Sequence, residues 1–205
     1  MHIINGNTSF AALEAMRQSL RDGYGEILCY HSCKVYDQHD YQDGLQVASS
    51  ELVRKIANKV FRVEDYIHQQ KVSSLISRYT INDIGVIHFS LDKRLFQDAF
   101  HYLRFGSESL FKLADELKLE FPEYNFRKMM VERGTPTLIS FRVSIDQLPA
   151  AICDEIDSIL ETAIENRWRD PFIGASFFTK SSVPRDQFVA LQKVNLPQNL
   201  IGIPE

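Results

Sequence analysis

The feature that most constrains this fold is the run from Glu26 to Lys34, in which apolar, β-prone residues give way to tyrosine, histidine, serine and lysine. Gly25 precedes this run and a polar, turn-rich segment at 35–44 follows it, so the run is predicted to be a buried β-strand. A strand that ends in hydrogen-bonding side chains presents donors and acceptors at the edge of a sheet, where a ligand has room to bind. The alternative is an ordinary strand end, at which His31 is a structural histidine satisfied by its neighbours.

Periodic apolar residues predict the rest of the secondary structure. Helices are expected over residues 8–22, 50–60, 63–76, 93–102, 107–118 and 146–167, and further strands over residues 85–91, 137–145, 175–179 and 188–191. Strands toward both ends of the chain with helices between them predict an α+β fold rather than a regular βαβ repeat. We expect a single domain, in which helix 8–22 packs on a core formed by residues 25–195 and Trp168 closes that core.

The composition sets only broad limits. The chain has 205 residues, 44% hydrophobic and 24% charged, which is typical of a globular protein. A net charge of −4 excludes a global field that attracts nucleic acid, although a local basic groove remains compatible with it. The sequence contains no membrane-spanning run and no signal peptide, so we expect a cytoplasmic protein with no membrane partner. Cys29, Cys33 and Cys153 complete no zinc-binding pattern and are expected to be reduced, buried thiols.

Several common motifs of enzyme sites do not occur in the sequence. The patterns GxGxxG, GxxxxGK[ST], HExxH and GxSxG are all missing. The chain therefore offers no anchor for a dinucleotide-binding Rossmann domain, a P-loop nucleotidase, a zinc protease or an α/β-hydrolase.

Four short segments, taken together, resemble the ADP-ribosyltransferase superfamily. The sequence Tyr-His-Ser-Cys-Lys at 30–34, followed by Gly44-Leu45, resembles the first motif of that superfamily. Residues 85–91 are similar to its second motif, residues 133–139 to a strand of RNA 2'-phosphotransferases and DarT-like DNA-modifying enzymes, and residues 177–189 to their final element. The segments follow the order of the family and span most of the chain. The resemblance implies an ADP-ribosyltransferase-like mixed sheet with helices inserted between the strands.

The resemblance also implies a function. Such an enzyme takes NAD as its substrate and transfers ADP-ribose to a protein or a nucleic acid, as bacterial toxins and antiviral defence enzymes do. Cleavage of the bond between nicotinamide and ribose produces an oxocarbenium-like centre, which a carboxylate stabilises in the transition state. A toxin of this kind is compatible with an inhibitory partner protein.

The residues that match the motifs inherit roles from the resemblance. His31 would bind the ribose on the adenosine side, and Glu108 would bind the other ribose and stabilise the cation. Ser32 would contact the nicotinamide end, on which Tyr102 or Phe105 would stack, and Lys34 or Arg104 would meet the pyrophosphate. The implied catalytic residues are therefore His31, Tyr102 and Glu108, and the implied NAD-binding residues are Tyr30, Ser32, Lys34, Ser90, Arg104 and Phe105.

The sequence departs from the family at the last acidic position. DarT-like enzymes carry a glutamate on their final strand, whereas the matching position near Ser176 holds no acid. Either Glu108 takes this role, with Glu132 as a second choice, or the site has lost its carboxylate. Glu108 also follows Ser107, a predicted N-cap, where an acid serves only the helix dipole. Tyr102 likewise has an alternative as a core residue, because apolar residues surround it at helical spacing.

Two other functions therefore remain open. A non-catalytic module that binds NAD or ADP-ribose needs no carboxylate. An RNA 2'-phosphotransferase-like enzyme needs several basic residues around a phosphate, for which the chain offers Lys34, Arg104 and Arg133. The choice of acceptor is expected to lie in the segments 35–44 and 115–130, which are expected to form loops.

Overall fold

The structure is a computed structural model. It describes residues 3–4, 25–62, 74–75, 78, 85–98, 101–166, 171–172 and 174–197. The expected helix 8–22, most of the expected helix 63–76, and Trp168 lie outside the described residues.

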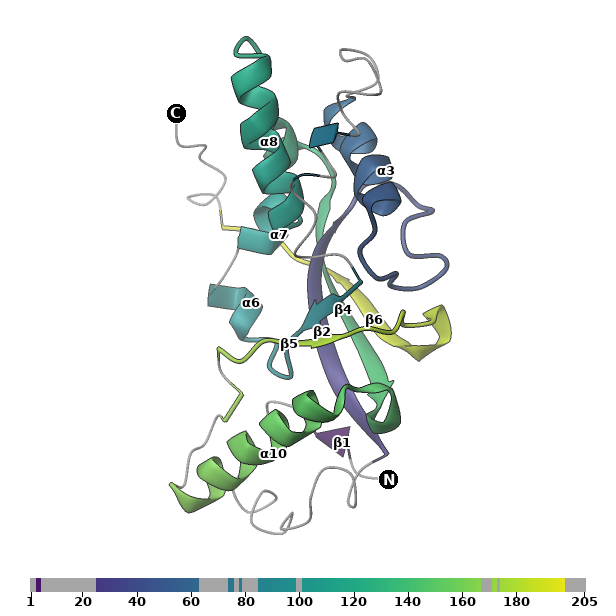
Figure 1. The fold of residues 1–205 in the computed structure, drawn as a ribbon, viewed down its shortest axis with the longest axis vertical. Helices are drawn as coiled ribbons and strands as arrows, with labels where there is room; N and C mark the ends of the chain where they lie inside the picture. The colour runs from purple at the N-terminus through teal and green to yellow at the C-terminus, as the bar shows by residue number, and fades with distance from the viewer. Residues whose placement is uncertain are drawn as a thin grey trace.

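A four-stranded sheet forms the centre of the described fold (Figure 1). Its strands are β1 (Ile3–Ile4), β2 (Glu26–Val35), β4 (Thr135–Ser144) and β6 (Phe188–Lys193), in the order β1-β2-β4-β6. β1 and β2 are parallel, and the other two pairs are antiparallel. β2 and β4 pair over their whole length, from Glu26 opposite Ser144 to Val35 opposite Thr135. The predicted strand 26–34 is confirmed as the long β2, while β1 was not predicted.

A second, smaller sheet joins the first through β2. It pairs β3 (Ile87–Phe89) with β5 (Phe177–Thr179) in antiparallel orientation. The residue after β3, Ser90, forms an isolated bridge with Tyr30, in which each backbone N–H donates to the carbonyl of the other, at 2.8 and 2.9 Å. β2 therefore contacts both sheets, and its middle lies at their junction.

The helices cover the two ends of the sheets (Figure 1). α3 (Ser50–Phe61), α8 (Glu108–Glu120) and α9 (Phe126–Glu132) lie at one end, and α10 (Ala150–Glu165) lies at the other. Two short helices, α6 (Leu95–Asp98) and α7 (His101–Phe105), lie between them. Because the described helices and strands are mixed along the chain and most strand pairs are antiparallel, the α+β prediction is confirmed at the level of the fold class.

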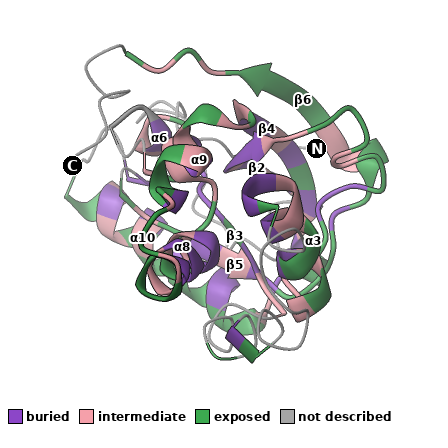
Figure 2. Ribbon diagram, turned by 90° about the horizontal axis from the view of Figure 1, so that it is seen from above, coloured by how far each residue is buried: buried purple, intermediate pink, exposed green. Residues whose placement is uncertain are grey.

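The buried side chains form three clusters. The largest joins both sheets to α10 and contains Cys29, Cys33, Phe89 and Phe141. A second holds α3, α8 and α9 together around Phe61 and Phe126. A third, small cluster places Tyr30 and Leu138 against Phe96 and Leu103 of the short helices. Figure 2 shows the contrast between the buried β2 and the exposed edge strand β6. The three cysteines are buried and free, as predicted.

Three predicted elements were wrong in detail. The expected helix 93–102 corresponds to α6 and α7, and α7 continues past 102 to Phe105, directly before Gly106 with φ +94°. The expected loop 115–130 instead contains the end of α8 and most of α9, whose N-cap Asn125 accepts a hydrogen bond from the N–H of Lys128. The expected helix 146–167 begins four residues late, because Pro149 occupies the N-cap and keeps the preceding residue out of the helical region.

Candidate functional site

The strand β2 divides the predicted site residues between its two faces. Side chains alternate along a strand, so Tyr30, Ser32 and Lys34 share one face and His31 lies on the other. The buried clusters agree with this division, because Tyr30 packs with Leu103 of α7, whereas the neighbours of His31 along its own face, Cys29 and Cys33, belong to the core of both sheets. The structure therefore separates His31 from the other residues of its motif.

His31 connects β2 to the second sheet. Its Nδ1 lies 2.8 Å from the carbonyl oxygen of His88 on β3. Since a carbonyl only accepts, Nδ1 carries the proton and Nε2 is left as an acceptor. Burial lowers the pKa of His31, so the imidazole is neutral near pH 7. This bond gives His31 a structural role. Contact between its Nε2 and a ribose stays a prediction.

The junction of the two sheets carries a buried carboxylate that sequence reasoning missed. Asp92 is 1% exposed, and its backbone N–H donates to Ser90 Oγ at 3.1 Å. Its carboxylate binds the guanidinium of Arg94, with Nε 3.0 Å from both oxygens. Burial raises the pKa of Tyr30, and the negative charge of Asp92 raises it further. The available signal was the sequence Ser-x-Asp-x-Arg directly after a predicted strand, which is typical of a hydrogen-bonded turn.

Lys34 is buried and directed at the ends of two helices. Its ammonium donates to the carbonyl of Arg104 at 3.2 Å, to that of Val131 at 2.9 Å and to that of Met130. These carbonyls belong to the last turns of α7 and α9, where backbone acceptors lack helical partners. Burial lowers the pKa of Lys34 to about 8. The lysine therefore has a structural role, and a pyrophosphate would have to compete with three carbonyl groups for it.

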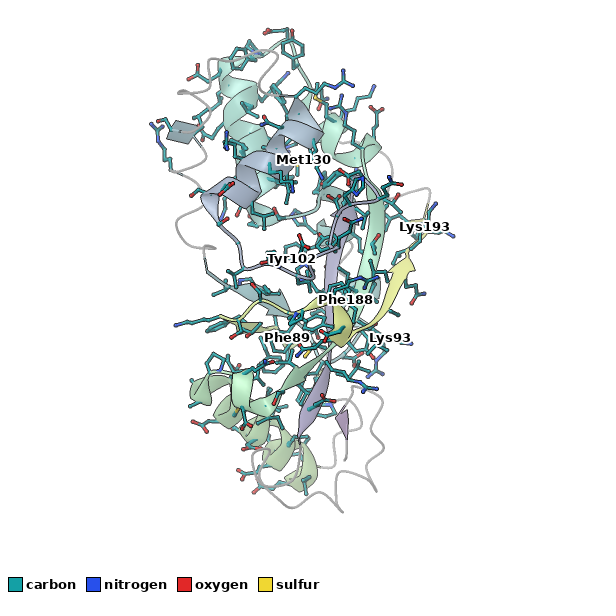
Figure 3. The ribbon with its side chains drawn as sticks, turned by 90° about the vertical axis from the view of Figure 1, so that its right-hand side faces the viewer. Phe89, Lys93, Tyr102, Met130, Phe188 and Lys193 are labelled. Atoms are coloured by element: carbon teal, nitrogen blue, oxygen red, sulfur yellow. The ribbon has the colours of Figure 1, made fainter. Side chains whose placement is uncertain are left out.

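Two aromatic rings of the α7 helix differ in their surroundings, because one is exposed and the other is packed against neighbouring side chains. Tyr102 is 43% exposed, so it is not a core residue, and its ring meets the edge of His101 at 5.5 Å. Phe105 packs on Phe111 at 5.0 Å, and Arg104 lies over its ring at 4.9 Å. Figure 3 shows Tyr102 between Met130 of the helical end and Phe89 of the second sheet. Of the two candidates for stacking, Tyr102 is therefore the more accessible.

Glu108 is the first residue of α8, as predicted. Ser107 caps the helix by accepting from the N–H of Leu110 at 3.3 Å. The Glu108 side chain is 43% exposed and lies 3.4 Å from His101 Nε2 and 3.9 Å from Lys112 Nζ. Among the described residues, no hydrogen bond or ion pair joins Glu108 to His31. The second-choice acid, Glu132, is 58% exposed at its side chain and pairs with Lys128 on α9 at 3.7 Å.

Two of the motif segments that are distant in sequence are bonded to each other. Leu45 N–H donates to the carbonyl of Val183 at 2.9 Å, and Val183 N–H returns a bond of 2.8 Å. Gly44 has φ +86°, and a Cβ atom there would lie 2.0 Å from the Val183 oxygen. Only glycine fits this approach, which explains the glycine at position 44.

Some residues of the predicted site thus lie together, whereas His31 and Glu108 each lie apart from that group. Tyr30 and Ser90 are bonded through their backbones, and Lys34 connects the same face of β2 to Arg104 of α7. His31 lies across the strand, and Glu108 lies beyond α7 at the start of the next helix. Ser32 is buried within β2 at 6% exposure.

Neither a metal nor a membrane helix is indicated by the described residues. They contain no group of three or more histidine, cysteine, aspartate and glutamate side chains placed to hold a metal ion. Within the same residues, no helix is long and apolar enough to span a bilayer.

Comparison with known proteins found no similar protein. No family model, curated protein or solved structure matches the chain.

Proposed function

We propose that this chain is an NAD-dependent ADP-ribosyltransferase that modifies a macromolecule. The observation that carries the proposal is the backbone bonding of the first of the four segments that resemble the superfamily to each of the other three. Tyr30 of the first segment is bridged to Ser90 of the second, and the same strand β2 pairs with β4, which holds most of the third. Gly44-Leu45 is bonded to Val183 of the fourth. Segments that share a site must be adjacent, and these four are.

The chemistry requires that the two riboses and the nicotinamide of NAD be held while a positive charge develops on one sugar. A neutral His31 with Nδ1 fixed by the His88 carbonyl would offer Nε2 to a ribose hydroxyl. Tyr102, which is exposed and lies beside the ring of His101, would stack on the nicotinamide ring. Arg104 would bind the pyrophosphate with its guanidinium, in preference to the buried Lys34.

Glu108 would supply the negative charge near the developing cation. Its present partners, His101 and Lys112, are contacts at 3.4 and 3.9 Å on an exposed surface, which hold a carboxylate only weakly. A glutamate in this position is able to change rotamer toward a bound substrate at low cost. Asp92 is a less suitable acid, because Arg94 already neutralises its buried carboxylate.

A second candidate is a non-catalytic module that binds NAD or ADP-ribose. It is favoured by β5, because neither this strand nor Ser176 before it contains an acid. An RNA 2'-phosphotransferase-like enzyme is less well supported, since one of its three basic residues, Lys34, is already bound by three backbone carbonyls at the helix ends.

Incubation with NAD labelled in its adenylate part tests the proposal directly. A transferase is expected to release nicotinamide and to leave label on an added protein, RNA or DNA. If the protein binds NAD but releases no nicotinamide with any acceptor, the non-catalytic module is established instead. If it neither binds NAD nor releases nicotinamide, both functions are rejected.

A further inference from the structure

A separate polar cleft lies at the C-terminal end of β2. Its volume is about 350 Å³, and it is lined by Tyr36, Asp37, Lys59, Arg62, Arg133 and Gly134. The lining comes from three segments: the loop after β2, the end of α3, and the turn between α9 and β4. Three cationic side chains and one carboxylate thus converge from elements that are distant in sequence.

The fold fixes two of these cations in place. Lys59 forms ion pairs with Asp37 and Asp40, the two carboxylates of the loop after β2. Arg133 donates through one terminal nitrogen to the carbonyl of Val60 in the last turn of α3. A guanidinium has five N–H donors, so this bond orients Arg133 and leaves most of its donors for another acceptor. Arg133, held in this way by a neutral carbonyl, loses little conformational freedom when it binds an anion, whereas the charge of Lys59 is already balanced by its two carboxylates.

The third cation, Arg62, occupies a backbone position that favours glycine. It is the C-cap of α3 with φ 53° and ψ 43°, and its N–H closes the helix on Asn58 at 2.9 Å. The left-handed conformation strains any residue with a Cβ, and glycine is the usual choice at helix ends of this type. An exposed arginine is present instead. Strained residues of this kind concentrate at sites that bind ligands.

We infer that this cleft binds the phosphate groups of a nucleic-acid strand. Arginine forks match the geometry of phosphate oxygens and bind them in pairs, and the cleft is large enough for a nucleotide unit. The net charge of the chain is −4, so the attraction must be local, as it is here. The inference rests on the proposed function in one respect, the naming of nucleic acid as the acceptor. Phosphate binding itself requires no NAD.

Fluorescence anisotropy with a labelled, short single-stranded RNA, in the absence of NAD, tests the cleft. Arg62→Ala is expected to weaken binding about tenfold and to lower the slope of log affinity against log salt by about one. Arg54→Ala is the matched control, because it removes the same charge from an exposed position of the same helix outside the cleft. Its binding is expected to change by less than about twofold. Equal losses in the two variants would overturn the cleft in favour of a diffuse charge effect.

Arg62→Gly separates binding from folding. Glycine relieves the strain at the C-cap, so the melting temperature is expected to rise by about 2 °C while RNA binding falls as in Arg62→Ala. Unchanged RNA affinity in this more stable variant would contradict the inference.

Titration with inorganic phosphate at constant ionic strength distinguishes the two sources of the phosphate. Phosphate binding that depends on Arg62, without any RNA binding, would assign the cleft to a small phosphorylated molecule. Binding of neither RNA nor phosphate overturns the inference even if the protein transfers ADP-ribose to another protein. RNA binding that depends on Arg62 in a chain that releases no nicotinamide would reject the proposed function alone.

Discussion

At the level of single residues, the position of Glu108 suits two different roles, of which the catalytic one is proposed. A carboxylate in the first turn of α8 interacts favourably with the helix dipole and so stabilises the helix by about 0.3–1 kcal/mol. A carboxylate that faces an oxocarbenium-like transition state stabilises it by several kcal/mol. The contacts with His101 and Lys112 are those of the first role, and only a change in turnover distinguishes the second.

Glu108→Gln removes the charge and keeps the size of the side chain. If the proposal is right, nicotinamide release is expected to fall at least about a hundredfold, with little change in melting temperature. Glu120→Gln, at the exposed other end of α8, is the control and is expected to keep full activity. If the protein is a toxin, Glu108→Gln should also permit expression in cells that the wild type poisons. An active enzyme indifferent to Glu108→Gln would direct the search to Glu132.

His31→Ala removes both the bond to the His88 carbonyl and the predicted contact with a ribose. Calorimetry is expected to show NAD affinity weakened by about 1–3 kcal/mol, the cost of a lost buried polar contact. Circular dichroism checks that the variant is folded. A folded His31→Ala variant that binds NAD as tightly as wild type would leave His31 with its structural role alone.

At the level of elements, Lys34 connects β2 to the ends of α7 and α9. Sequence alone predicts the strand and places the lysine at its end, but the helix α9 was missed and the expected helix 93–102 stopped short of Phe105, the last residue of α7. The partners of the ammonium are backbone carbonyls, which have no signature in the sequence. A cationic strand end was therefore interpreted as a phosphate ligand, whereas its nearest acceptors are carbonyls of the protein itself.

The pH dependence of the free energy of unfolding tests whether Lys34 is buried. The pKa of Lys34 is lowered to about 8 in the fold, against 10.5 in the unfolded chain. Between these values the unfolded chain holds a proton that the fold has lost, so raising the pH stabilises the fold. The free energy of unfolding of wild type, relative to Lys34→Met, is expected to increase by up to about 3 kcal/mol from pH 8 to pH 10.5. Urea unfolding measures this difference.

Lys55→Met, at an exposed position on α3, is the control for alkaline effects elsewhere in the chain. Its free energy of unfolding relative to wild type should be constant over the same range of pH. A constant difference for Lys34→Met as well would mean that Lys34 keeps its proton in the fold.

At the level of the whole molecule, two contacts bring distant segments together. The bridge between Tyr30 and Ser90 joins the two sheets, and the bridge between Leu45 and Val183 ties the loop after β2 to the segment before β6. The second bridge depends on Gly44, which leaves no space for a side chain.

Gly44→Ala is expected to destabilise the protein by more than about 3 kcal/mol. Its Cβ would meet the Val183 oxygen at 2.0 Å in addition to the strain of φ +86°. Gly174→Ala is a matched control, because Gly174 has φ +80° but nothing within 4 Å of its Cβ position, so it should lose only about 1 kcal/mol. Urea unfolding of both variants measures the difference, and equal losses would show that the close approach to Val183 adds nothing.

The sequence by itself determined the elements with strong local signals. The strand at 26–34 follows from its apolar composition, and the helix at 50–60 follows from the N-cap Ser49 and its apolar periodicity. The α+β class follows from the order of such elements along the chain. The likeness to ADP-ribosyltransferases also came from the sequence, and it stays a prediction.

Only the tertiary structure decided which side chains meet. The alternation of β2 puts His31 and Tyr30 on opposite faces, and the junction with Ser90 brings in Asp92, which no motif had indicated. The cleft around Arg62 and Arg133 likewise joins segments whose charges are unremarkable one by one. Local patterns report the environment of a residue along its own element, whereas a site is made where elements cross. The crossing depends on long-range backbone pairing that short sequence patterns do not encode.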